Sequence, residues 1–224
     1  MTQLPLDLGF RPALGRADFL VAPCNEAAIA WLDRWPHWPS PALALYGPAG
    51  SGKTHLSEVW RARSGAASID PRALTPASVP HLLRAAKAAV VDDADRAGEE
   101  ALLHLYNLLA ERPGHLLVVA REAPSRWGIK LADLRSRLLA GPAVAVSAPD
   151  EAVLGAVLVK LFADRQLEIG QEVVAYLLVQ IERSFAAAQE AVAALDAASL
   201  AEGRAVTVPL ARTVLSQLRG RDRG

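Results

Sequence analysis

The chain has 224 residues, enough for one α/β core and a small second domain. Hydrophobic residues make up 52% of the sequence, so a core can be buried and wholesale disorder is excluded. The 24 Lys and Arg residues balance the 24 Asp and Glu residues. A broad basic surface that grips nucleic acid is therefore not expected, and any DNA contact should be weak or indirect.

Cysteine use and hydropathy narrow the class of protein further. Cys24 is the only cysteine, which excludes a disulfide or a thiolate zinc site within one chain. No apolar run approaches membrane-spanning length, and the N-terminus lacks the basic-then-apolar order of a signal peptide. We expect a cytoplasmic protein without a membrane contact.

The N-terminal part predicts a tail followed by a helix. Residues 1–17 are expected to be a flexible tail, because prolines and glycines interrupt every candidate element. Asn25 has the side chain of a helix N-cap, which predicts a helix over 26–35 that stops before Pro36.

Strand and helix patterns then alternate up to residue 148. The expected strands are 43–46, 67–69, 88–91, 115–119 and 143–146. The expected helices between them are 54–63, 78–86, 99–112 and 131–139. This alternation predicts an α/β domain over 18–148, with a parallel sheet sandwiched by helices.

Only helical patterns follow Pro149. The expected helices are 150–165, 171–180, 184–200 and 208–218, with Asp150 as the cap of the first. We therefore expect a small all-helical domain over 149–220.

Residues 47–54 read Gly-Pro-Ala-Gly-Ser-Gly-Lys-Thr, between an expected strand and an expected helix. The glycines let backbone N–H groups turn inward around an anion, and the helix N-terminus adds a favourable dipole. Lys53 would reach the β- and γ-phosphates, and the Thr54 hydroxyl would join a Mg²⁺ shell. The expected phosphate-binding residues are Gly47, Pro48, Gly50, Ser51, Gly52, Lys53 and Thr54. The pattern predicts a site for ATP or ADP with Mg²⁺.

Two acidic residues follow the apolar strand 88–91 directly. Asp92 would bind the magnesium through water, and Asp93 would orient or deprotonate the attacking water. The other interpretation is a pair of solvated acids at a strand end.

Arg137 lies near the end of the helix expected over 131–139. An arginine there can reach a γ-phosphate bound by a neighbouring subunit and stabilise transition-state charge. The alternative is an ordinary surface ion pair.

Together these residues resemble the AAA+ ATPases, and within them the DnaA-type replication initiators. The segment 19–25 is similar to the one that wraps adenine in that clan, which implies nucleotide contacts for Val21 and Asn25. The run Gly-Lys-Thr-His-Leu adds His55, and Arg-Ser-Arg-Leu at 135–138 is similar to the motif that carries the arginine finger. The resemblance thus implies a catalytic role in trans for Arg137.

Two positions depart from the clan's pattern. The end of the fourth strand, which commonly carries a polar residue that senses the γ-phosphate, reads Val-Ala-Arg-Glu at 119–122. The lid arginine that contacts the nucleotide should fall near Ala186, and Arg183 is the candidate to replace it. Weak intrinsic ATPase activity follows from these departures, so the resemblance favours a chain that acts mainly on a partner's ATP.

The chain stops after the helical lid, where initiators continue into a DNA-reading domain. An initiator core of this extent resembles the regulators that switch the initiator off. The tail segment 3–8, Gln-Leu-Pro-Leu-Asp-Leu, is similar to a sliding-clamp-binding hexapeptide. The clamp-binding residues would be Gln3, Leu4, Leu6 and Leu8.

The resulting hypothesis is an adenine-nucleotide-binding regulator of chromosome replication. It would dock on the DNA polymerase III sliding clamp and stimulate ATP hydrolysis by DnaA, and association into a homo-oligomer stays open. Two alternatives also stay open: an AAA+ ATPase that hydrolyses its own ATP, such as a helicase loader, and a nucleotide-gated clamp adaptor that touches no initiator.

Overall fold

The computed structural model describes residues 21–84 and 86–221. It divides into two compact units, and the boundary between them in the sequence falls between Ser147 and Ala148. The sequence placed this boundary one residue later. Each unit has its own buried core, and we describe the two separately.

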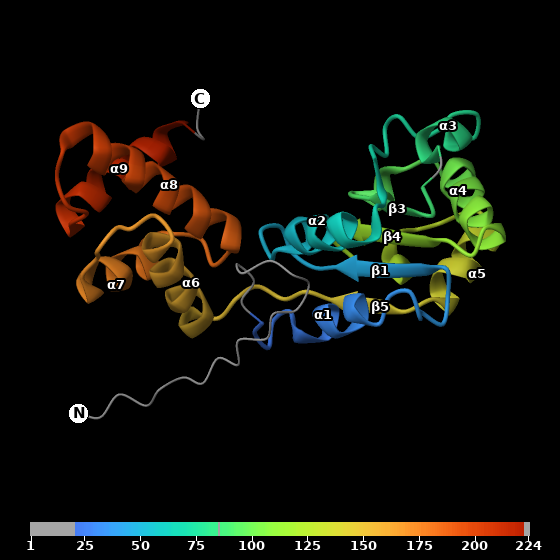
Figure 1. Cartoon of the computed structure of the whole chain (residues 1–224), viewed down its shortest axis with the longest axis horizontal. Coiled ribbons are helices and arrows are strands. Elements are labelled where there is room, and N and C mark those ends of the chain that lie inside the picture. The colour runs from blue at the N-terminus through green and yellow to red at the C-terminus, as the bar shows by residue number, and fades with distance from the viewer. Residues whose placement is uncertain (1–20, 85, 222–224) are drawn as a thin grey trace. The chain divides into compact units, whose positions relative to one another are not determined.

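A five-stranded sheet forms the centre of the first unit (Figure 1). Its strands are β1 (Ala42–Tyr46), β2 (Ala67–Ile69), β3 (Ala88–Val91), β4 (His115–Ala120) and β5 (Ala143–Ala145). Every pair is parallel and the order is β2-β3-β4-β1-β5. The predicted α/β class is confirmed, and β4, which is late in the sequence, separates β1 from β3.

Helices cover both faces of this sheet. Leu43 and Leu45 of β1 pack in one core cluster with α1 (Glu26–Asp33) and α2 (Lys53–Ser64). Ala42 and Ala44 belong to the cluster on the opposite face, because side chains alternate along a strand. That second face is covered by α3 (Val79–Leu83), α4 (Glu99–Glu111) and α5 (Ala132–Ala140). Short 3-10 turns η2 (Ala94–Arg96) and η3 (Pro124–Arg126) follow β3 and β4.

Aromatic rings consolidate the face covered by α1 and α2. Trp38 stacks on buried Trp60 with ring centroids 5.3 Å apart, and Trp35 meets the Trp60 ring edge-on at 6.1 Å. His115, the first residue of β4, contacts the rings of Trp35 and Trp38 edge-on. These contacts bury the tryptophans as packing groups.

The second unit consists of helices: α6 (Glu151–Ala163), α7 (Gln171–Gln180), α8 (Phe185–Glu202) and α9 (Val208–Arg221). Leu158 and Phe162 of α6 are fully buried with Leu177 of α7 and Leu195 of α8. Asp150 caps α6 by accepting a hydrogen bond of 2.8 Å from the Val153 N–H, as the sequence predicted.

Several local features differ from the sequence expectations. α1 ends at Asp33 rather than residue 35; the Trp35 N–H donates to the Leu32 carbonyl in a tighter turn before Pro36. α3 is short and ends at Leu83, because the next residue, Arg84, has a φ of 49°, outside the helical region. Asn25 makes no side-chain cap to α1; its Oδ1 instead accepts a hydrogen bond from the Ala22 N–H at 2.9 Å. No helix in the described part is long and apolar enough to cross a membrane.

Candidate nucleotide-binding site

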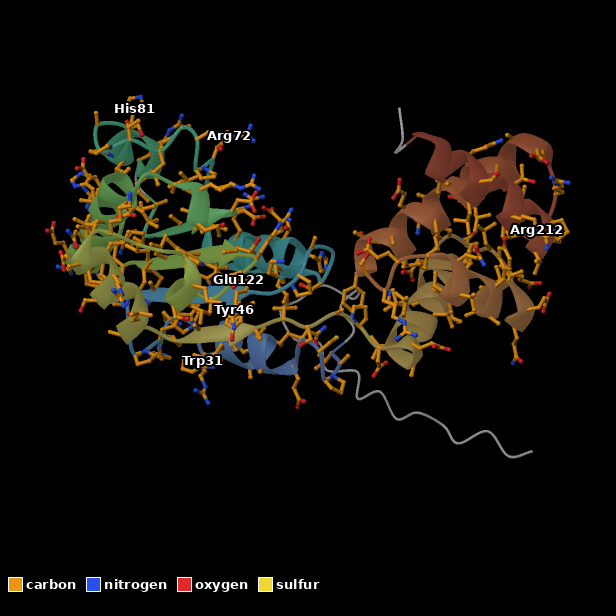
Figure 2. The ribbon with its side chains drawn as sticks, turned by 180° about the vertical axis from the view of Figure 1, so that it is seen from behind. Trp31, Tyr46, Arg72, His81, Glu122 and Arg212 are labelled. Carbon is orange, nitrogen blue, oxygen red and sulfur yellow. The ribbon has the colours of Figure 1, made fainter. Side chains whose placement is uncertain are left out.

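The loop 47–52 connects β1 to α2, and its first residue is held between two neighbouring strands. The Gly47 N–H donates to the Ala120 carbonyl at the end of β4, at 3.3 Å. A Cβ on Gly47 would lie 2.0 Å from the Val146 carbonyl, beyond β5, so no side chain fits there. Figure 2 shows Tyr46, the last residue of β1, on the same sheet edge as Glu122, which follows β4. The loop thus begins at the carboxyl edge of the sheet.

The rest of the loop turns on glycines and leads into a helix N-terminus. Gly50 and Gly52 have φ angles of 70° and 96°, which favour glycine. Gly52 is the N-cap of α2 and makes no side-chain cap, so the first N–H groups of α2 are available to an anion. Ser51 is 1% exposed, and its hydroxyl has no hydrogen-bond partner among the described residues. A buried donor inside a glycine loop fits a phosphate oxygen.

Lys53, at the start of α2, is the buried cation of the site. It is 8% exposed, and its Nζ donates to the carbonyls of Gly47 and Pro48 at 2.8 and 2.7 Å. Burial lowers the pKa of Lys53; the nearby charge of Asp92 opposes this shift and that of Arg121 adds to it. The ammonium group is therefore held against the backbone of the loop.

The side chains of Thr54 and Asp92, which the sequence analysis expects to hold magnesium, contact each other. The Thr54 hydroxyl donates to Asp92 Oδ2 at 2.9 Å, and Asp92 Oδ1 accepts from the Asp93 N–H at 2.9 Å. No group of three or more His, Cys, Asp or Glu side chains in the described part could hold a metal. A Mg²⁺ ion here would complete its shell with phosphate oxygens and water, as this ion commonly does.

Asp93 has a left-handed backbone conformation, with φ 48° and ψ 41°. Such a conformation is uncommon for a residue other than glycine, although aspartate tolerates it better than most. Its carboxylate pairs with Arg96 at 3.4 Å, and both side chains are about half exposed. The Asp93 carboxylate is thus occupied by an ion pair with Arg96, and its role as a base remains a prediction.

The segment expected to contact adenine reaches the same sheet edge. Val21 packs on the core cluster formed by α1, α2 and the sheet. The Cys24 carbonyl accepts a hydrogen bond from the Ser147 N–H at 2.9 Å, next to the Val146 carbonyl that Gly47 approaches. Val21 and buried Asn25 are thus on the β5 side of the loop, and His55 is exposed on α2.

Arg137 lies on α5, where its guanidinium contacts Asp133 and Tyr106. Its Nε donates to Asp133 at 2.8 Å, and its Cζ is 5.5 Å from the ring centroid of Tyr106. The Asp133 hydrogen bond raises the pKa of Arg137, a side chain that is charged in proteins in any case. No hydrogen bond from its two terminal amino groups is found within 21–84 and 86–221. The surface ion pair that the sequence left open exists, and its hydrogen bond uses Nε.

Two further sets of expected residues do not belong to the described part of the first unit. Arg183 belongs to the second unit, where its guanidinium pairs with Glu151 at 3.3 Å. Its contact with a nucleotide remains a prediction. The expected clamp-binding residues Gln3, Leu4, Leu6 and Leu8 fall outside the described residues.

Glu99, at the start of α4, holds the segment before α5, and the sequence analysis missed it. Its carboxylate accepts hydrogen bonds from the backbone N–H groups of Lys130 at 3.1 Å and Leu131 at 2.6 Å. These bonds lower the pKa of Glu99. Glu99 thus fixes the backbone just before α5, the helix that carries Arg137. The only sequence signal that pointed to Glu99 was an acidic residue in the first turn of a helix.

Comparison with known proteins bears on both units. Residues 152–215, in the second unit, match the family described as Hda, lid domain. A protein of Haemophilus influenzae described only as uncharacterized is 29% identical over 192 residues, covering 79% of this chain and 82% of its own length.

Solved structures of other proteins share the fold. Domain III of the Thermotoga maritima initiator DnaA has a TM-score of 0.74 at 18% identity, covering 92% of this chain and 97% of that one. DnaA from Aquifex aeolicus bound to AMPPCP has a TM-score of 0.62 at 19% identity, covering 77% of this chain and 61% of that one. A single-residue variant of Thermotoga maritima RuvB has a TM-score of 0.70 at 14% identity, over 87% of this chain and 68% of that one. The fold is that of an AAA+ protein.

Proposed function

We propose that this Hda-like AAA+ protein of the DnaA clan binds adenine nucleotide and stimulates ATP hydrolysis by the initiator DnaA. In this proposal the chain docks on the DNA-loaded sliding clamp through residues 3–8. It donates Arg137 to the ATP that DnaA carries, which limits re-initiation of replication. The lid match and the DnaA-like fold support a DnaA-related regulator.

The observation that carries the proposal is the state of Arg137. Asp133 accepts a hydrogen bond only from Nε of Arg137, and the Tyr106 ring supports the guanidinium from one side. The two terminal amino groups are the pair that binds phosphate oxygens in a bidentate manner. A guanidinium held this way is preorganised to stabilise the charge that develops during phosphoryl transfer.

The chain's own nucleotide has a structural role in the proposal. Gly47, Lys53 and Thr54 would hold the phosphates of ADP or ATP, and Asp92 would share the Mg²⁺ with Thr54. Asp93 pairs with Arg96, which supports slow hydrolysis by the chain itself. A bound nucleotide stabilises whichever conformation binds it better, so it would favour the conformation that presents α5.

The experiment measures conversion of DnaA-bound ATP to ADP, with and without this protein and with and without clamp loaded on DNA. The proposal expects acceleration only when both are present. Gln3→Ala combined with Leu4→Ala should abolish the acceleration and leave nucleotide affinity unchanged. Steady ATP hydrolysis by this chain alone, lost on Asp93→Asn, would contradict the proposal and indicate a motor or loader. Clamp binding without acceleration would indicate an adaptor.

A further inference from the structure

Two tryptophans near the amino edge of the sheet are only partly covered by the core. Trp31 lies on α1, and Trp35 follows it in the connection to β1. Both pack on the core cluster of that face, yet each stays partly exposed, whereas Trp60 of the same cluster is fully buried. Part of each indole is therefore available at the surface of the first unit.

A guanidinium lies over each of these two rings. The Cζ of Arg34 is 4.7 Å from the centroid of the Trp31 ring, and the Cζ of Arg63 is 5.8 Å from that of Trp35. Both arginines are exposed. The electrons of an indole face attract a cation placed over it, which restricts the motion of a long side chain. Each arginine thus presents its N–H groups to solvent from a position that a ring supports.

The residue before β3 adds a third cation to this edge. Lys87 is exposed, and its carbonyl accepts a hydrogen bond of 2.9 Å from the N–H of His115, whose ring contacts Trp35 edge-on. Asp33 offsets one charge, because it pairs with Arg63 at 3.2 Å. Three cationic side chains against this one carboxylate leave an excess of two positive charges. The amino-edge cluster is defined by Trp31, Arg34, Trp35, Arg63 and Lys87.

Rings and cations side by side match the chemistry of a nucleic acid strand with unpaired bases. Its phosphates bind cations, and its bases stack on aromatic rings and on guanidinium planes. An acidic protein segment would use the charges and leave the rings without a role. A duplex would bring phosphates and keep its bases stacked inside. Because Lys and Arg only balance Asp and Glu over the whole chain, such a contact would be local and sensitive to salt.

We propose that the amino-edge cluster binds single-stranded nucleic acid: its cations hold phosphates, and its two tryptophan–arginine pairs stack bases. The cluster lies at the opposite edge of the sheet from the phosphate loop, which follows the carboxyl end of β1. Binding there therefore depends neither on the nucleotide site nor on Arg137. In the proposed function it would add a weak hold on an unpaired strand beside the clamp.

The test is the fluorescence anisotropy of a labelled oligo(dT), about 15 nucleotides long, titrated with the full-length protein at low salt. We expect log affinity to fall against log salt with a slope of about −2, as about three neutralised phosphates on a single strand require. Arg34→Glu should weaken binding by about tenfold or more. Trp31→Leu keeps an apolar side chain, removes the ring and should weaken binding by about fivefold or more.

Arg72→Glu is the matched control for Arg34→Glu. Arg72 is also an exposed arginine of the first unit, but it follows the carboxyl end of β2, and Figure 2 shows it far from Trp31. Both reversals change the net charge of the protein by the same amount. Arg72→Glu should therefore bind the oligonucleotide as the parent does.

Several results would overturn the inference. No binding by the parent at low salt rejects the surface outright, and equal losses in Arg34→Glu and Arg72→Glu would indicate general attraction between charges. A duplex of the same length that binds as tightly, or an unchanged affinity in Trp31→Leu, would reject base stacking. Poly-glutamate that displaces the probe as well as unlabelled oligo(dT) does would indicate a site for acidic protein. If Trp31→Leu unfolds, the comparison of Arg34→Glu with Arg72→Glu and the duplex still decide.

Discussion

The Thr54 hydroxyl donates a hydrogen bond of 2.9 Å to the Asp92 carboxylate, which is 38 residues further along the chain. Thr54 is the second residue of α2, which follows the phosphate loop and β1. Asp92 follows β3, which is two positions from β1 in the sheet. This bond brings together a hydroxyl and a carboxylate oxygen, both ligands that Mg²⁺ accepts. When a nucleotide brings Mg²⁺ to the site, each side chain can give up this hydrogen bond and bind the metal instead.

Asp92→Asn should make nucleotide binding lose most of its dependence on Mg²⁺. The amide is a weaker ligand for a hard cation, and it removes the charge that offsets the metal. We expect ATP affinity with Mg²⁺ to fall by about tenfold and affinity in EDTA to change little. Titration with and without Mg²⁺ checks this result. Asp95→Asn replaces a nearby exposed acid and should behave as the parent; an equal loss in both variants would reject the metal role of Asp92.

Gly47→Ala should destabilise the first unit and abolish nucleotide binding. The added Cβ would lie 2.0 Å from the Val146 carbonyl, which is backbone and cannot turn aside. We expect the free energy of unfolding to fall by about 2 kcal/mol or more, measured by urea denaturation. Gly155→Ala, within α6, meets only ordinary contact at 3.5 Å from Leu178 and should be neutral or stabilising. A Gly47→Ala protein as stable as the parent would contradict the close approach seen here.

His115 should make the protein less stable as the pH falls. Burial against the rings of Trp35 and Trp38 lowers its pKa, and His37 adds to the shift against an opposing backbone hydrogen bond at Pro36. The folded-state pKa thus lies below the unfolded value of about 6.5. The unfolded chain binds the proton first, so the free energy of unfolding falls as the pH drops through about 6.5.

His115→Gln removes this titration and should flatten the slope of stability against pH between about pH 7 and pH 5. The measurement is urea denaturation at several pH values in that interval. His104→Gln, at an exposed position of α4, should keep the slope of the parent. An unchanged slope in His115→Gln would show that His115 does not cause the dependence.

Glu99→Ala should weaken stimulation of DnaA and leave nucleotide binding intact. Loss of the hydrogen bonds to Lys130 and Leu131 frees the segment before α5, which carries Arg137. Because a small misplacement of a catalytic group is costly, we expect stimulation to fall by about tenfold. Glu100→Ala removes the neighbouring exposed acid and should stimulate as the parent does. Equal stimulation by Glu99→Ala and the parent would show that Glu99 does not position Arg137.

Local patterns predicted those parts of the fold that depend on neighbours in sequence. The phosphate loop, its flanking strand and helix, and the acids after β3 are contiguous runs, so their residue types sufficed. The Asp133–Arg137 pair is one helical turn apart and was open to the same reasoning. The order of the strands could not be predicted in this way, because β4 lies between β1 and β3 through pairings of residues remote in sequence.

Long-range contacts explain what the sequence left out. Glu99 and Leu131 are 32 residues apart, and nothing in either local pattern links them. Arg121 was recognised as a departure from the clan's pattern, but only the position of β4 places it beside the loop. The end of α3 depends on the backbone of Arg84, which helical periodicity does not reveal.

The most direct test compares Arg137→Ala with Arg135→Ala in single-turnover hydrolysis of DnaA-bound ATP, with clamp loaded on DNA. Both arginines lie on α5, and only Arg137 is held by Asp133 and Tyr106. The account predicts that Arg137→Ala loses at least about tenfold of the stimulation while its clamp and nucleotide affinities match the parent. Arg135→Ala should stimulate as the parent does. Full stimulation by Arg137→Ala would contradict the central claim.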